Sequence, residues 1–436
     1  MSGPLQPPPL DAVGCDAVGC DAVGCDAVDF DPASFDPASF DPVTAAYTVA
    51  PQRWFPAIHA RSPVFLSGRY DAWMIFDYAV GKTVLSDLRF SRDRSNWERP
   101  GEQRAVERWP LTEVLRRESP FVNQAKHRAN RAMYSGAFKP SAIRRMEHII
   151  LGVIEEYCAP LRSAREVDLV ALLASIPNTV ISRVVGIAPE AQAEARFKDA
   201  ASQFLLASSP FGSDANRDLA EQGTGYLFDA IGELVERRRR QPADDLVSGL
   251  LEGAGDRPDV GRDIVLSVAS LISAGTDTTR HSAALALRTL LRRRDVLAQL
   301  RRDRQLLDAA VLELLRHEFP AKFLVRFATE DVRIGDHLFE QGKMVLTTLH
   351  GCGWDPQVFD DPARIDLGRD QRRYPVFGHG EFYCLGAHLA KFQLKHIIAY
   401  FLDHLPDTAL FDEQRVEWEA PDMVLRGLAS MPLTLR

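Results

Sequence analysis

The chain has 436 residues, of which 46% are hydrophobic and 26% charged, and its formal net charge at pH 7 is −8. A chain of this length and composition can bury a large core. The negative balance gives no reason to expect binding to nucleic acid or to a membrane surface, so chemistry on a small molecule is the better expectation.

The first 43 residues differ in composition from the rest. They hold a Pro-rich start, three copies of DAVGC and two of DPASF. The five-residue spacing matches neither a CxxC metal clip nor a repeat large enough to bury its own core. We therefore predict a flexible low-complexity leader over 1–43, with metal or partner binding as the alternative, and a single domain over 44–436.

Targeting and redox signals are weak. The amino terminus shows no basic stretch followed by an apolar core, and no run of about eighteen apolar residues occurs. Six cysteines in so long a chain, three of them inside the repeat, do not resemble a disulfide framework. We expect a cytoplasmic protein without a membrane anchor.

Helical patterns dominate the chain after the leader. Apolar residues at three- and four-residue steps predict helices over 142–158, 165–186, 218–240, 263–293, 305–318 and 385–403. Short strand-like stretches lie at 64–76, 323–327, 331–339 and 343–349. The sequence thus predicts a mainly α fold with small β-sheets.

The predicted helix 263–293 carries the polar string Ala274-Gly275-Thr276-Asp277-Thr278-Thr279 near its middle. Glycine costs about 1 kcal/mol relative to alanine there, and threonine can bond the backbone one turn back, so we expect a loosened turn. A carboxylate beside an alcohol can pass protons from solvent, which makes Asp277 and Thr278 candidates for a proton relay. An ordinary helix with a polar spot is the alternative.

The next predicted helix, 305–318, places Glu313 and Arg316 three residues apart on one face. Taken alone, this spacing predicts a solvated ion pair on the protein surface.

A glycine-rich loop, Phe377-Gly378-His379-Gly380-Glu381-Phe382-Tyr383-Cys384-Leu385-Gly386, runs directly into the last predicted helix. A metal-bound cysteine must stay deprotonated, and the free N–H groups and dipole at a helix start stabilise a thiolate. Gly378 and Gly380 let the turn bend sharply against a flat cofactor, and Phe377 adds an aromatic shield. A buried structural cysteine is the competing interpretation of Cys384.

This loop resembles the cytochrome P-450 signature Phe-Gly-x-Gly-x-(His or Arg)-x-Cys-x-Gly. The pair Asp277-Thr278 is similar to that family's acid–alcohol pair, and Glu313-x-x-Arg316 is similar to its Glu-x-x-Arg. The resemblance extends over almost the whole chain after the leader. It departs from the family at Phe382, where a His or Arg usually meets a haem propionate, at Tyr374, which replaces a His, and at Gly353-Trp354, which replaces Asn-Arg. We expect these departures to alter how the haem is seated or its redox potential.

The resemblance implies the triangular, mainly α cytochrome P-450 fold. Haem b would lie between the long central helix and the cysteine loop, with Cys384 as axial ligand of the iron. The pair Glu313 and Arg316 would brace the loop, with Arg364 or Arg373 as a possible third member. The residues implied to contact the haem or its propionates are His127, Arg131, Ala274, Arg326, Phe377, Gly378, Cys384 and Gly386.

The activity implied is insertion of one oxygen atom of O2 into a small organic substrate, by hydroxylation or epoxidation, in a monomer that takes electrons from a ferredoxin and its reductase. A secondary metabolite or lipid-like molecule is the expected substrate. Lys322 is a cation able either to hold a substrate carboxylate or to extend to solvent. The alternatives are a peroxide-using peroxygenase, a non-catalytic haem-thiolate sensor and a helical scaffold without haem. The expected pocket residues are Leu271, Ala274, Lys322, Phe323, Leu324 and Leu428.

Overall fold

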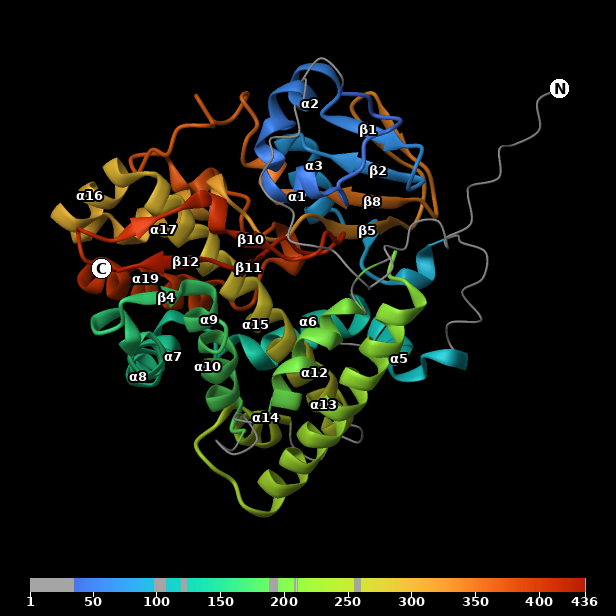
Figure 1. Ribbon diagram of the computed structural model, residues 1–436. Coiled ribbons are helices and arrows are strands. Elements are labelled where there is room, and N and C mark those ends of the chain that lie inside the picture. The colour runs from blue at the N-terminus through green and yellow to red at the C-terminus, as the bar shows by residue number, and fades with distance from the viewer. Residues whose placement is uncertain are drawn as a thin grey trace.

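The computed structural model describes residues 35–97, 107–118, 124–187, 195–207, 209, 211–254 and 260–435. Most of the predicted leader lies outside these residues. Helices fill two corners of a roughly triangular molecule, and the largest sheet occupies the third (Figure 1). This is the mainly α architecture with small sheets that the sequence predicts.

The helices are α1 (Ala45–Val49), α2 (Phe55–Arg61), α3 (Tyr78–Ser86), α5 (Pro110–Glu118), α6 (Gln124–Ser135), α7 (Pro140–Arg145), α8 (Glu147–Cys158), α9 (Leu169–Leu173), α10 (Ile176–Val185), α12 (Ala195–Leu206), α13 (Asp214–Arg240), α14 (Leu246–Ala254), α15 (Val260–Arg292), α16 (Arg294–Arg302), α17 (Leu307–His317), α18 (Leu349–Cys352) and α19 (Ala387–His404). The strands are β1 (Val64–Ser67), β2 (Ala72–Ile75), β3 (Phe90–Ser91), β4 (Glu166–Asp168), β5 (Leu324–Ala328), β6 (Val332–Ile334), β7 (His337–Phe339), β8 (Met344–Thr347), β9 (Leu410–Phe411), β10 (Glu417–Trp418), β11 (Leu428–Ser430) and β12 (Pro432–Thr434).

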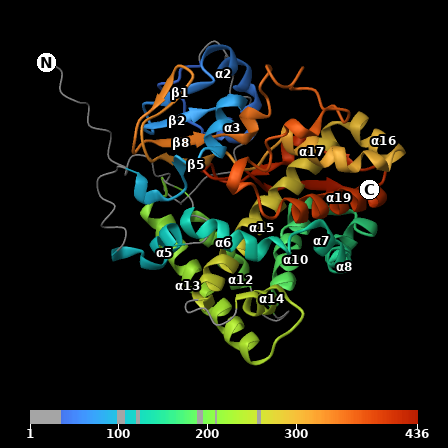
Figure 2. The ribbon, with the colours of Figure 1, turned by 180° about the vertical axis from the view of Figure 1, so that it is seen from behind.

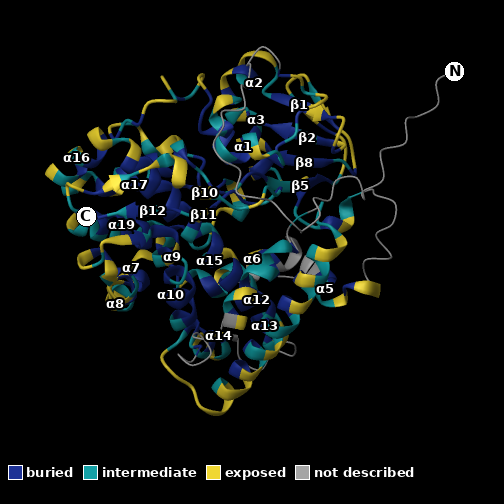
Figure 3. Ribbon diagram, viewed as in Figure 1, coloured by how far each residue is buried: buried dark blue, intermediate teal, exposed yellow. Residues whose placement is uncertain are grey.

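Helix α15 runs through the centre of the molecule and packs against α10, α12, α13, α17 and α19. Views from both sides place it between these helices (Figures 1 and 2). Most of its residues are buried, as the dark ribbon in Figure 3 shows. Its small residues, such as the run Ala283–Ala284, allow close helix packing. The expected loosened turn is absent, since the helix continues without a break through Gly275.

The largest sheet has five strands in the order β1-β2-β8-β5-β3. Only β2 and β8 run parallel, and the other neighbours are antiparallel. Strand β3 pairs with β5 so that Phe90 lies opposite Ala328 and Ser91 opposite Phe327. The predicted stretch 64–76 is the hairpin of β1 and β2, and 331–339 is the hairpin of β6 and β7.

One helical prediction is wrong at its start. Residues 166–168 of the predicted helix 165–186 form β4, which pairs with β12 near the carboxyl terminus. The rest divides into α9 and α10, and α10 ends at Gly186 with φ +95°. Local periodicity carries no information about a partner strand more than 250 residues away, so the period alone could not identify β4.

The predicted leader boundary at residue 43 is also wrong. Phe35 and Phe40 are buried, and the ring of Phe40 lies 5.3 Å edge-on from Tyr47 and 5.9 Å from Phe76. Beyond these rings, the Lys322 ammonium donates hydrogen bonds to the Pro42 carbonyl (3.0 Å) and the Thr48 hydroxyl (2.8 Å). Residues from 35 onward therefore belong to the folded domain.

Among the described residues, no helix combines the length and apolar character needed to cross a bilayer.

Candidate functional site

The cysteine loop joins the end of a 3-10 turn, η8 (Gly380–Phe382), to α19. Cys384 differs from the other two cysteines of the described residues, because Cys158 and Cys352 are buried while Cys384 is exposed. Its N–H donates to the Phe377 carbonyl at 2.9 Å, which closes the loop just before the helix. The loop thus presents one accessible sulfur at a helix start.

Two glycines shape this loop in the way the sequence predicts. Gly378 and Gly380 have φ values of +73° and +71°, a region that favours glycine. A Cβ on Gly380 would lie 2.7 Å from Cα of Ser86 and 2.8 Å from the carbonyl oxygen of Leu85. Backbone cannot yield at such distances, so any side chain at Gly380 would push the loop away from α3.

The electrostatics of the sulfur are mixed. Crowding by protein atoms raises the pKa of the Cys384 thiol, whereas the Gly386 N–H and the Arg131 guanidinium lower it. The net direction is upward, so the helix start alone does not keep the sulfur ionised as we expected. A coordinating metal cation deprotonates a thiol outright, and the N–H and the guanidinium would then stabilise the anion.

Phe382, the main departure from the expected signature, lies among nitrogen-bearing side chains. The ring of His127 is 4.2 Å from that of Phe382, and the guanidinium groups of Arg92 and Arg326 lie 5.3 and 5.2 Å from its centroid. His127 also contacts the Glu381 carbonyl through Nε2 at 3.1 Å. The structure therefore brings together two predicted residues, His127 and Arg326, with Arg92, which sequence reasoning missed.

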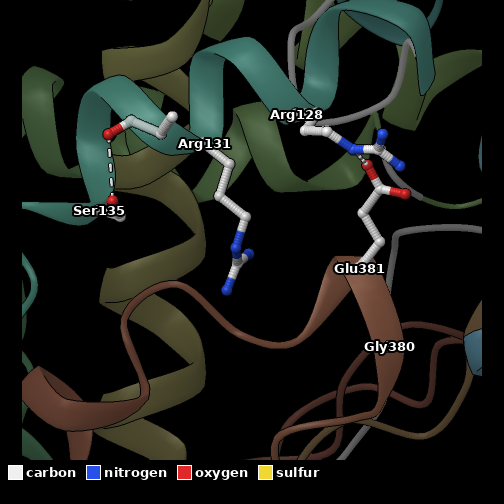
Figure 4. Close-up of a pocket in the computed structure, with 6 residues that line it drawn as sticks. Arg128, Arg131, Ser135, Gly380 and Glu381 are labelled. Atoms are coloured by element: carbon white, nitrogen blue, oxygen red, sulfur yellow. Dashed lines mark hydrogen bonds and ion pairs between the residues drawn. The ribbon is translucent and has the colours of Figure 1, made fainter.

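Arg131 points elsewhere. It extends from α6 toward the cysteine loop and lines a surface pocket of about 380 Å³ (Figure 4). Arg128 also lines this pocket and lies 3.5 Å from the Glu381 carboxylate. Arg131 is near enough to Cys384 to lower the pKa of its thiol. It is thus a cation on the side of the loop that faces α6.

Glu313 and Arg316 form a buried ion pair rather than a surface one. Both side chains are fully buried, and two parallel hydrogen bonds of 2.8 Å join them. Arg316 also donates to the carbonyls of Gly353 and Pro362 at 2.9 Å. Burial raises the pKa of Glu313, but the hydrogen bonds and charge of Arg316 outweigh it and lower that pKa.

The third member of this network is Arg369, so both candidates from the sequence are wrong. Nε of Arg369 lies 3.3 Å from the Glu313 carboxylate. Arg364 contributes only its carbonyl, and its side chain pairs with Asp366. No ion pair of Arg373 occurs among the described residues. The segment 360–373 lacks a regular period that would show which arginine turns inward.

Two other departures from the family pattern serve the same network. The Tyr374 hydroxyl donates to the Glu313 carboxylate at 2.6 Å. A Cβ on Gly353 would lie 3.1 Å from Cγ of Arg316, so the glycine lets that arginine approach closely. Trp354 packs in the core and donates to the His317 carbonyl. These residues therefore stabilise the buried network of Glu313 and Arg316.

On α15, Ala274 is exposed although the helix around it is mostly buried. The Thr278 hydroxyl donates to the Ala274 carbonyl at 2.5 Å. Asp277 is buried and accepts from Nε of Arg280 at 2.7 Å and from the Ser202 hydroxyl at 3.3 Å. Arg280 in turn bonds Glu419, a partly exposed carboxylate, at 3.1 Å.

Three of the expected pocket residues do not face open space. Lys322 is buried, with its ammonium on the carbonyls of Pro42 and Asp422 and on Thr48. Leu428 is 0% exposed, and Phe323 is buried in the same cluster as Phe76. Segments distant in sequence cover these side chains. Leu271 and Leu324 are partly accessible, like the exposed Ala274.

These residues fit a metal-bearing, anionic, planar group. An exposed sulfur would ligate the metal, and the exposed Ala274 offers a methyl-sized surface on α15. Two arginines, Arg92 and Arg326, have no bonded carboxylate among the described residues, so an acidic group on the ligand would balance them. Both the sulfur and the cations are therefore matched by haem b.

Comparison with known proteins agrees with this fit. The family model described as cytochrome P450 matches residues 102–406. The chain is 30% identical to the cytochrome P450 monooxygenase PikC of Streptomyces venezuelae over 378 residues, covering 84% of this chain and 86% of PikC. It is 30% identical to 6-deoxyerythronolide B hydroxylase of Saccharopolyspora erythraea over 390 residues, 86% of this chain and 92% of the hydroxylase. The epothilone D-bound cytochrome P450epoK superposes with a TM-score of 0.84 at 22% identity, covering 92% of this chain and all of that one.

Proposed function

Because the chain belongs to the cytochrome P-450 family and is a haem-thiolate monooxygenase, we propose that Cys384 is the ligand of its haem iron. The enzyme is proposed to hydroxylate or epoxidise a small organic substrate. Haem b supplies activation of O2 when bound, and a cysteine thiolate on the iron donates electron density that favours this chemistry. The accessible sulfur of Cys384 at the start of α19 is the observation that carries the assignment.

Asp277 and Thr278 are proposed to deliver protons. The Thr278 hydroxyl sits one helical turn from the exposed Ala274, and rotation of its side chain would release its proton from the Ala274 carbonyl. Asp277 is linked through Arg280 to the partly exposed Glu419. Arg280 has no acceptor atom, so it orients these two carboxylates and does not pass protons itself. The groups proposed to take up and release protons are the Asp277 carboxylate and the Thr278 hydroxyl.

Electrons are proposed to come from a separate ferredoxin. The pocket between α6 and the cysteine loop presents Arg128, whose side chain is 81% exposed, and Arg131. Arginines at a surface close to the metal ligand suit an acidic electron-transfer partner, because charge complementarity speeds encounter and fixes orientation. This side of the molecule is shown in Figure 4.

The substrate is proposed to be an apolar secondary metabolite. The relatives 6-deoxyerythronolide B hydroxylase and the nocardicin C N-oxygenase of Nocardia uniformis are named for the small organic compounds that they oxidise. Ala274, Leu271 and Leu324 would give the pocket wall an apolar surface. Apolar walls with few polar groups are typical of small-molecule sites.

The decisive experiment is the absorption spectrum of the reduced, carbon-monoxide-bound protein. Wild type and the control Cys158→Ala should show the band shifted by a thiolate ligand, and Cys384→Ser should lose it. A wild-type spectrum without that band, or a Cys384→Ser spectrum that keeps it, would refute the assignment.

The proton relay is tested by coupling of electron use to product. With a ferredoxin, its reductase and any substrate that turns over, Thr278→Ala should release most electrons as hydrogen peroxide, because its proton donor is lost. Coupling equal to that of wild type removes Thr278 from the relay. Efficient turnover of wild type with hydrogen peroxide alone would instead favour a peroxygenase.

A further inference from the structure

Arg92 lies beside the predicted propionate ligand Arg326 because of strand pairing. Phe90 and Ser91 of β3 lie opposite Ala328 and Phe327 of β5. Arg92 follows the last residue of β3 directly, and continuing this register by one step would set it opposite Arg326. Residues directly opposite in such a pair point to the same side of the sheet and can act on one ligand group.

Phe382 holds the two guanidinium groups together. Each lies just over 5 Å from its ring centroid, within reach of a cation–π interaction. A His or Arg at this position would place a third nitrogen group between them. The phenyl ring instead contacts both cations and competes for none of their hydrogen-bond acceptors.

Neither guanidinium is neutralised by a residue that the structure describes. Among the described residues no carboxylate bonds to Arg92 or Arg326, and the one hydrogen bond of Arg326 goes to the Val325 carbonyl at 2.9 Å. Burial, with the neighbouring charge of Arg92, lowers the pKa of Arg326 to about 9. Two adjacent cations, Arg326 buried and Arg92 partly buried, repel each other, and an anion between them would remove that cost.

We propose that Arg92 is a haem-propionate ligand that acts with Arg326 and replaces the residue missing at position 382, with Phe382 as the platform for both. Arginine is suited to this role because its planar fork donates two parallel hydrogen bonds to a carboxylate. The inference rests on the proposed function, since it presumes that haem binds at Cys384.

The test measures haem retention rather than turnover. Haem transfer from the holoenzyme to excess apomyoglobin is followed for wild type, Arg92→Gln, Arg92→Lys and the control Arg89→Gln, whose side chain is 49% exposed and pairs with Asp87. We expect Arg92→Gln to lose haem about tenfold faster, Arg92→Lys to recover part of the loss and Arg89→Gln to match wild type. Introducing Phe382→His into Arg92→Gln should restore retention.

A second measurement separates a propionate contact from a structural role. Haem-free wild type should bind iron protoporphyrin IX better than its dimethyl ester, and Arg92→Gln should lose most of that preference. Haem-free Arg92→Gln should unfold at a temperature no lower than haem-free wild type, because one of two repelling cations is gone.

Equal haem loss from Arg92→Gln and Arg89→Gln overturns the inference, as does an unchanged preference for the free acid or a lower unfolding temperature of haem-free Arg92→Gln. These results leave the proposed function standing if wild type keeps its thiolate band. A wild type that binds no haem overturns both.

Discussion

Two arginine clusters contact the segment 374–382, and they differ in how their charge is balanced. Next to Tyr374, Arg316 and Arg369 share the buried carboxylate of Glu313. Beside Phe382, Arg92 and Arg326 have no carboxylate partner among the described residues. We call the first the braced cluster and the second the open cluster.

The difference separates support from binding. A buried cation is costly unless an anion is near. The braced cluster meets that need within the chain, so it is complete before any ligand arrives. The open cluster has no such carboxylate among the described residues, and the proposed haem propionates would balance its charge. The same residue type thus serves the fold in one place and a ligand in the other.

The largest loss of stability is expected when the braced cluster loses its carboxylate. Glu313→Gln removes the negative charge that Arg316 and Arg369 share, and we expect the free energy of unfolding to fall by about 3 to 5 kcal/mol. Urea unfolding of the haem-free protein checks this. Arg326→Gln serves as the comparison, since loss of the Arg326 guanidinium should not destabilise the haem-free protein. Equal losses for the two variants would contradict the distinction.

A third arginine cluster, around Glu318, also has its own carboxylate, and the contribution of that carboxylate to stability should depend on pH. Buried Glu318 bonds Arg426 at 2.6 Å and Arg288 at 3.4 Å. Burial raises the pKa of Glu318, but the charges of Arg426 and Arg288 outweigh this and lower that pKa to about 2. Between about pH 4.5 and 2 the unfolded chain therefore binds a proton at this residue that the folded chain does not.

The free energy of unfolding should accordingly fall as the pH drops through that window, by up to about 3 kcal/mol from this group. The measurement compares urea unfolding of wild type and Glu318→Gln from pH 6 downward. The difference in free energy of unfolding between the two proteins should become smaller as the pH falls and Glu318 takes up a proton in the unfolded chain. A difference that stays constant below pH 4.5 would show that Glu318 is not held ionised by its arginines.

The smallest effect is expected at Tyr374. Its hydroxyl makes one hydrogen bond to a charged acceptor, so Tyr374→Phe should cost about 1.5 kcal/mol in urea unfolding, with little change in haem retention. Faster haem loss without lower stability would place Tyr374 with the open cluster instead. Because Tyr383 is exposed and has no such bond among the described residues, Tyr383→Phe is a suitable control.

Helices with a long apolar period could be predicted from the sequence, and so could the glycine turns around Cys384. What failed depends on contacts between distant segments. Lys322 looks like a pocket cation until the segment at Pro42 and Thr48 covers it. Arg369 could not be told from its neighbours in an aperiodic loop. Arg92 becomes informative only once β3 is paired with β5.

The early segment around Thr48 has a consequence for the order in which the protein folds. The Thr48 carbonyl accepts a hydrogen bond from Nε of Arg426 at 2.8 Å, and the Thr48 hydroxyl accepts one from Lys322. The Val49 carbonyl also accepts one from Arg426. During synthesis this segment leaves the ribosome well before Lys322 and Arg426, the residues that hold it. Contacts of such long sequence separation form slowly. Docking of α1 therefore waits until Arg426 has emerged, and a translation product that stops before Lys322 would leave Phe40 and Tyr47 more accessible to chaperones and proteases.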